Sequence, residues 1–92
     1  MSASRELSLM LRETRAARNI TSALQDRSGR PQAAEQALEV MESLSRAIAL
    51  FAVAATSDTW TEHTLAAFQK ANQTLEQLRS AITALLTASA LR

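Results

Sequence analysis

The chain has 92 residues, of which 47% are hydrophobic and 3% aromatic, and its formal net charge is +1. It contains no cysteine, which excludes disulfides, thiol nucleophiles and thiolate metal sites. The near-neutral charge by itself indicates neither nucleic-acid nor membrane binding. Alanine and leucine dominate and there is one glycine and one proline, so we expect a single all-α domain over residues 1–92.

The first predicted helix covers about residues 5–25. Apolar residues recur there at helical spacing, with Thr14 in a gap of the stripe. Charged residues are expected on the opposite side, namely Arg5, Arg12, Glu13, Arg15 and Arg18. The members of this stripe are Leu7, Met10, Leu11, Ala17, Ile20 and Leu24. A break follows, because Gly29 can end a helix and Pro31 suits the first turn of the next one.

The second predicted helix covers about residues 31–55. Its expected core stripe is Ala34, Leu38, Met41, Leu44, Ile48 and Phe51. Every residue from 47 to 55 is apolar, so we expect other helices on more than one side of this half. The run is far shorter than the roughly 20 residues that a membrane span needs, and no membrane association is predicted.

The third predicted helix covers about residues 60–90. We expect it to follow a turn at Asp58, with Thr59 and Glu62 forming a capping box and Asp58 as the competing cap. Its apolar residues alternate steps of three and four, which is typical of a heptad seam. The members of this seam are Phe68, Ala71, Leu75, Leu78, Ile82 and Leu85.

The two breaks set the expected alignment of the helices. Folding the chain about Asp58 places Phe51 opposite Leu65, and folding it about Gly29 places Leu7 opposite Phe51. The second helix is thus matched from both directions. The simplest consistent fold is an up-down-up three-helix bundle.

Charged residues favour the same antiparallel order. Glu35, Glu39 and Glu42 are expected to pass within about a turn of Arg15 and Arg18. Such exposed ion pairs are worth roughly 0 to 1 kcal/mol each, so they would select the register more than they stabilise it.

The third helix is predicted to be longer than the second by about 6 residues, or roughly 9 Å. Its surplus apolar end predicts a partner groove or a homodimer through this helix. The expected partner-binding residues are Ile82, Leu85, Leu86 and Leu91, with Trp60 at the other end. Tryptophan is enriched at binding hot spots, but Trp60 is also placed to plug the end of the bundle, and the latter is favoured.

Arginines give the alternative site. The first thirty residues are net positive by three, with six arginines against Glu6, Glu13 and Asp26. One interpretation is phosphate contact by nucleic acid; the other is a solvated face that glutamates partly neutralise. The residues concerned are Arg12, Arg15, Arg18, Arg27 and Arg30.

No residue pattern indicates catalysis, a cofactor or a metal. His63 is the single histidine and has no second ligand at metal spacing. The sequence does not place a nucleophile, a general base and an orienting group within reach of one another, so an enzyme is not expected.

We therefore predict a small non-enzymatic helical module that binds a protein partner through an apolar helix face, as an adaptor, chaperone or inhibitor does. A nucleic-acid-associated regulator is the alternative. The N-terminus lacks a signal peptide's apolar core, which predicts a cytoplasmic protein. Nine arginines against one lysine suggest a GC-rich coding sequence and a bacterial or phage origin.

Overall fold

Three helices pack along one another in the order α1 (Ser4–Leu24), α2 (Arg30–Ala54) and α3 (Glu62–Ala90). A computed structural model describes residues 3–25, 30–57 and 59–90, with backbone only for 30–32 and 89–90. The predicted all-α fold of three packed helices is confirmed, and the bounds of α1 and α2 each differ from prediction by one residue. The expected turn residues Gly29 and Asp58 lie outside the described residues.

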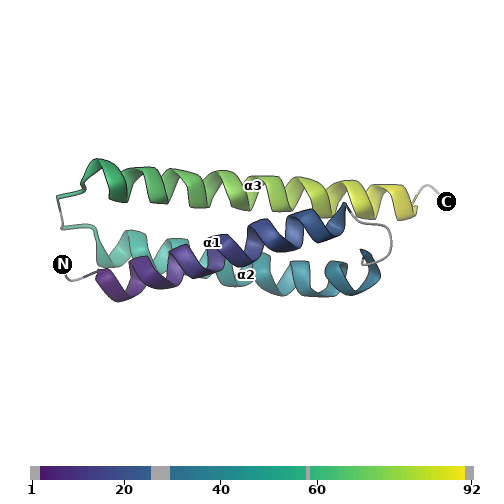
Figure 1. Cartoon of the computed structure of the whole chain (residues 1–92), viewed down its shortest axis with the longest axis horizontal. Helices are drawn as coiled ribbons and strands as arrows, with labels where there is room; N and C mark the ends of the chain where they lie inside the picture. The colour runs from purple at the N-terminus through teal and green to yellow at the C-terminus, as the bar shows by residue number, and fades with distance from the viewer. Residues whose placement is uncertain (1–2, 26–29, 58, 91–92) are drawn as a thin grey trace.

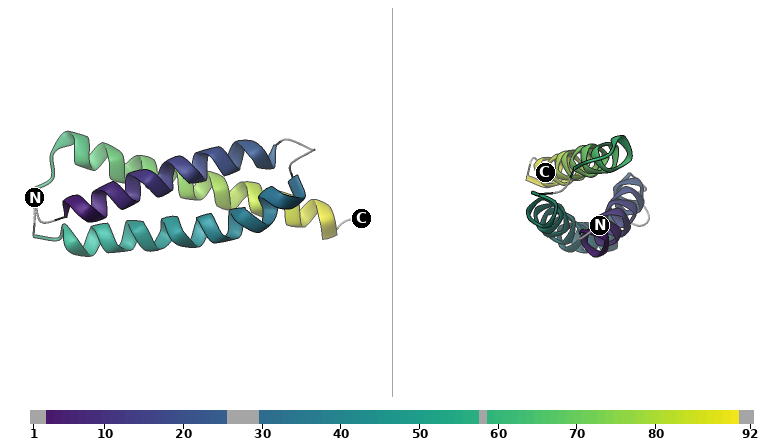
Figure 2. Two further views of the ribbon diagram at one scale, coloured as in Figure 1. Left: turned by 60° about the horizontal axis from the view of Figure 1, so that its bottom comes forward. Right: turned by 90° about the vertical axis from the view of Figure 1, so that its left-hand side faces the viewer.

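The helices form a rod of 50 × 19 × 19 Å. In Figure 1 the chain runs from left to right along α1, returns along α2 and runs from left to right again along α3. Seen along the rod in Figure 2, the helices occupy the corners of a triangle, and each contacts the other two. The core therefore lies along the long axis of the rod, between the three helices. Each helix has one face that points outward.

The core stripe of α1 largely agrees with the prediction. Met10, Ala17, Ile20 and Leu24 are buried, whereas Leu11 is exposed. The threonine in the gap of the stripe, Thr14, is buried as well. Its hydroxyl donates to the Met10 carbonyl oxygen at 2.7 Å, so the helix itself satisfies this polar group inside the core.

The second half of α2 also follows the prediction, because Leu44, Ile48 and Phe51 are buried. The first half does not. Leu38 is 53% exposed, and the neighbouring Ala37 is fully buried in its place. Successive residues are about 100° apart around a helix. The first half of α2 is therefore oriented so that Ala37, and not Leu38, faces the core.

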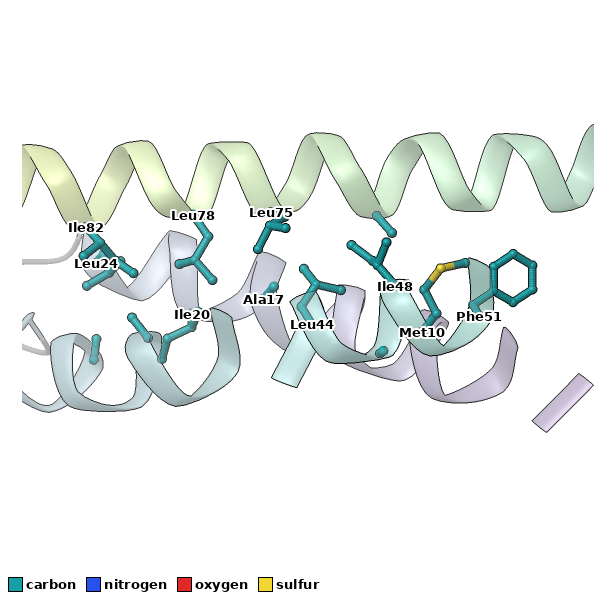
Figure 3. Close-up of a cluster of buried hydrophobic side chains, with 14 of the residues drawn as sticks. Met10, Ala17, Ile20, Leu24, Leu44, Ile48, Phe51, Leu75, Leu78 and Ile82 are labelled. Carbon is teal, nitrogen blue, oxygen red and sulfur yellow. The ribbon is translucent and has the colours of Figure 1, made fainter. Parts of the chain in front are cut away.

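The arrangement of the core side chains in Figure 3 explains why an alanine is buried here. Leu24 of α1 and Ile82 of α3 lie at the same end of the core. These large side chains fill the space near the beginning of α2, which contributes the buried alanines Ala33 and Ala37. Small residues facing large ones keep the interior close-packed.

The α3 seam is confirmed: Ala71, Leu75, Leu78 and Ile82 are buried, and Phe68 and Leu85 are half-buried.

The beginning of α3 differs from the prediction. The helix begins at Glu62, and its cap is Thr61, whose hydroxyl oxygen accepts the Thr64 backbone N–H at 3.1 Å. This is the usual bond from an N-cap side chain to the third helical residue. Thr59 is therefore not the cap, and Trp60 precedes the helix instead of beginning it.

This later start changes the register between α2 and α3. The ring of Phe51 packs on that of Phe68, with centroids 6.1 Å apart, while its expected partner Leu65 is exposed. Trp60 lies in the connection between α2 and α3, and its ring packs beside the rings of both phenylalanines. The two helices are thus offset by about one helical turn from the alignment predicted by symmetry about Asp58.

The expected ion pairs between α1 and α2 do not form within the described part of the chain. Glu42 instead bonds Arg46 of its own helix at 3.1 Å, and Arg12 lies 3.7 Å from Glu13. Glu42 is two residues from buried Leu44, which puts it about 200° around the helix from the core. Its carboxylate therefore faces solvent and not α1.

Phe51 has the largest side chain that is fully buried. We expect Phe51→Ala to lower the free energy of unfolding by about 3–5 kcal/mol, because it leaves a cavity between three helices. Urea titration followed by helical circular dichroism measures this loss. The control is Val53→Ala on the same helix, 76% exposed, which should change stability by less than about 0.5 kcal/mol. Equal losses in both variants would contradict the packing described here.

Candidate functional site

Trp60 belongs to an aromatic cluster at the end of the bundle. Its ring centroid lies 5.2 Å from that of Phe51 and 5.1 Å from that of Phe68. The indole N–H donates to the Ala55 carbonyl oxygen at 2.9 Å, just beyond the end of α2. Both the apolar body and the polar edge of the indole therefore have partners within the chain, as expected for a residue that plugs the bundle.

The other predicted partner-binding residues do not form one exposed surface. Ile82 is buried and Leu85 is half-buried, whereas Leu86 is 63% exposed. Leu91 lies outside the described residues. Of the described members of the C-terminal set, Leu86 alone offers most of its side chain to solvent.

The structure instead shows a hollow of about 550 Å³ between α2 and α3, which we call the α2/α3 groove. Exposed Leu38 and half-buried Met41 contribute apolar surface from α2, and Leu75 contributes it from α3. Sequence analysis missed Leu38 because it assigned this leucine to the core. The full lining is Leu38, Met41, Glu42, Ser45, Arg46, Ala49, Leu75 and Arg79.

Charges of both signs border the α2/α3 groove. Glu42 and Arg46 form an ion pair at 3.1 Å on α2, and Glu76 and Arg79 form one at 3.0 Å on α3. All four side chains are more than half exposed. Of these four residues, Glu42, Arg46 and Arg79 line the groove itself. The groove thus combines an apolar floor with a polar rim whose arginines are each paired with a glutamate, and an apolar centre with a polar rim is the usual anatomy of a protein interface.

The arginines of α1 lie on its outward face. Arg12, Arg15 and Arg18 are exposed, as is Arg5. The acids of this helix are turned inward: Glu6 Oε2 is buried without a hydrogen-bond partner among the described residues, and the Glu13 side chain is only 18% exposed. The prediction that Glu13 lies with the arginines on the outward side is therefore wrong. The solvent-facing side of α1 is consequently basic.

Arg12 lies near Glu13, whereas the other three arginines have no ionic partner among the described residues. Arg15 and Arg18 form no ion pair with any residue that the structure describes. They open onto a hollow of about 330 Å³ between α1 and α3, which we call the polar hollow. Its lining is Arg15, Arg18, Asn19, Thr21, Ser22 and Gln77. Arg27 and the side chain of Arg30 lie outside the described residues.

Sequence analysis identified the arginines but not the amides beside them. Asn19 follows Arg15 by four residues, a spacing from which the sequence alone predicts that both lie on one face of the helix. Gln77 has no such signal, since its proximity depends on how α3 packs against α1.

His63 is exposed in the first turn of α3. Among the residues that the structure describes, no group of three or more histidine, aspartate or glutamate side chains is placed to hold a metal ion. Within the same residues, no helix is both long enough and apolar enough to cross a membrane.

Compared with protein families, curated proteins and solved structures, the chain shows no significant match. Function is therefore inferred from the chain's own surfaces, namely the α2/α3 groove and the basic face of α1.

The hydrogen bond made by the indole N–H of Trp60 can be tested by substitution. Trp60→Phe keeps an aromatic ring beside Phe51 and Phe68 but removes the N–H that bonds the Ala55 carbonyl oxygen. We expect stability to fall by about 1 kcal/mol, the net worth of such a bond. Urea titration followed by circular dichroism measures it, with Thr59→Ala, an exposed neighbour, as the control. A Trp60→Phe variant as stable as the parent would contradict this bond.

Proposed function

We propose that the chain is a small non-enzymatic protein–protein interaction module that holds an amphipathic helix of a partner protein in the α2/α3 groove. It would act by stoichiometric binding, as an adaptor, chaperone or inhibitor. The observation that supports this most directly is the exposure of Leu38. Its side chain is 53% exposed beside Met41 and Leu75, where a larger hydrophobic core would bury a leucine. An apolar floor left open between two helices favours a partner that covers it.

One exposed leucine lies on α3 on either side of the groove. Leu86 follows Arg79 by seven residues, and Leu65 precedes it by fourteen, which is close to a whole number of turns in each case. Both leucines are therefore on the same side of α3 as Arg79, and both are exposed. From Leu65 to Leu86 this side extends about 32 Å, enough for a partner helix of about six turns.

A helix is the partner element that fits this surface best. The cleft between two helices accepts the side-chain ridges of a third, and an amphipathic helix anchors in such a groove through residues at steps of three and four. On this side a partner helix would complete a four-helix arrangement. Both arginines of the rim are paired with glutamates, so the rim favours a partner helix of mixed charge over a strongly acidic or basic one.

The proposal includes the finer expectations from the sequence. It takes the bundle to be up-down-up and the protein to be cytoplasmic and of bacterial or phage origin. It allows a second copy of the chain as the partner, in which case the groove would be a homodimer interface. The C-terminal contact retained from the sequence is Leu86, because Ile82 is buried beneath it.

A library of displayed amphipathic helical peptides tests the groove directly and does not require the natural partner. We expect peptides that bind the parent chain to lose at least about tenfold in affinity against Leu38→Glu, since a carboxylate would replace part of the apolar floor. The matched control is Leu50→Glu, which places the same charge on the same helix at a leucine that is 48% exposed near α1. Circular dichroism checks that both variants fold.

Sedimentation of the chain alone belongs to the same experiment. A dimer that Leu38→Glu dissociates and Leu50→Glu preserves would identify a second copy as the occupant of the groove. Failure to select any helical peptide tighter than about 100 µM, together with a monomer in sedimentation, would contradict the proposal. Equal losses in the two variants would contradict it as well.

A further inference from the structure

We propose that the outward face of α1 binds the phosphate backbone of nucleic acid, with Arg15 and Arg18 as the central contacts. This site is separate from the α2/α3 groove and does not depend on the proposed protein partner. Its basis is the sorting of charge on α1: the arginines point to solvent, while Glu6 and Glu13 are turned toward the bundle. A chain with a net charge of only +1 thereby presents one strongly basic face.

Arg15 and Arg18 are the members of this face best prepared for an anion. They lie three residues apart on the helix, so their like charges repel each other in the free protein. Neither has an ion-pair partner among the described residues. An anion placed between them would relieve the repulsion, and each guanidinium can donate two parallel N–H bonds to phosphate oxygens.

The polar hollow beside them adds neutral donors. The amides of Asn19 and Gln77 line it, and both groups can donate to a phosphate oxygen. The Thr21 hydroxyl already donates to the Ala17 carbonyl oxygen at 2.7 Å and is not needed. An adjoining hollow contains Glu76, but Arg79 bonds that carboxylate at 3.0 Å.

The extent of the basic face favours a chain of phosphates over a single one. From Arg5 through Arg12 to Arg18 the exposed arginines span fourteen residues of α1, which is about 20 Å along the helix. They wind about 140° around its outward side, from the border with α2 to the border with α3. One phosphate would need only the central pair, whereas a nucleic-acid strand offers successive phosphates along this length. The α1 sequence contains no aromatic residue that would form a stacking platform for bases, so we expect phosphate contacts to dominate and the affinity to depend little on base sequence.

The test is fluorescence anisotropy of a labelled 20-base-pair DNA duplex at salt concentrations from 50 to 200 mM. We expect the parent chain to bind with an affinity that falls as salt rises. The double variant Arg15→Gln/Arg18→Gln should make the slope of log K against log salt less negative by about 1.8, for two lost phosphate contacts. A single strand of the same sequence shows whether the duplex is preferred.

A control with the same change in net charge makes the result specific. The double variant Ser45→Glu/Arg46→Gln also lowers the net charge by two, but at the α2/α3 groove, and it leaves the Arg79–Glu76 pair intact. We expect this variant to bind the duplex within about twofold of the parent chain. All substituted residues are exposed, so both double variants should retain the helical circular dichroism of the parent.

Three outcomes would overturn the inference. The first is no binding of the duplex or of the single strand at 50 mM salt. The second is an equal loss of affinity in the two double variants, which would indicate attraction by net charge alone. The third is displacement of the duplex by polyglutamate at equal charge concentration, with the same sensitivity to Arg15→Gln/Arg18→Gln. That result would assign the face to an acidic protein.

Discussion

The structure depends on the packing of Trp60 between Phe51 of α2 and Phe68 of α3. The indole N–H bonds the Ala55 carbonyl oxygen, so the same residue fixes the end of α2 and the approach to α3. Helices slide past each other in steps of a turn, and a large ring held at one end selects one of these steps. The alignment of α3 along α2 follows from this cluster.

That alignment, with the rotation of α2, determines which residues are left for function. At the end of the core far from Trp60, large side chains of α1 and α3 fill the interior, and α2 contributes alanines. Leu38 is displaced to the surface as a result and becomes part of the α2/α3 groove. Glu42 of the same helix faces solvent and pairs with Arg46, which leaves Arg15 and Arg18 without acidic partners from the described part of α2. Both proposed binding surfaces thus depend on which residues of α2 face the core and which face solvent, although the surfaces lie on different pairs of helices.

Sequence patterns predicted the three helices and the core faces of α1 and α3, because a single stripe at helical spacing marks a helix with one buried side. They failed on the first half of α2, which lies between two helices and has Ala37 and Leu38 as adjacent candidates for the core. The choice between them depends on the volume of Leu24 and Ile82, which no local pattern contains. Gln77 was missed for the same reason, since it reaches Arg15 and Arg18 only through the packing of α3 on α1.

The most direct test of this account is a nuclear Overhauser spectrum of the aromatic side chains. We predict cross-peaks from the Trp60 indole to the rings of both Phe51 and Phe68, and slow solvent exchange of the indole N–H that bonds Ala55. Cross-peaks from Phe51 to Leu65 without any to Phe68, together with a freely exchanging indole N–H, would contradict the register from which both surfaces are derived.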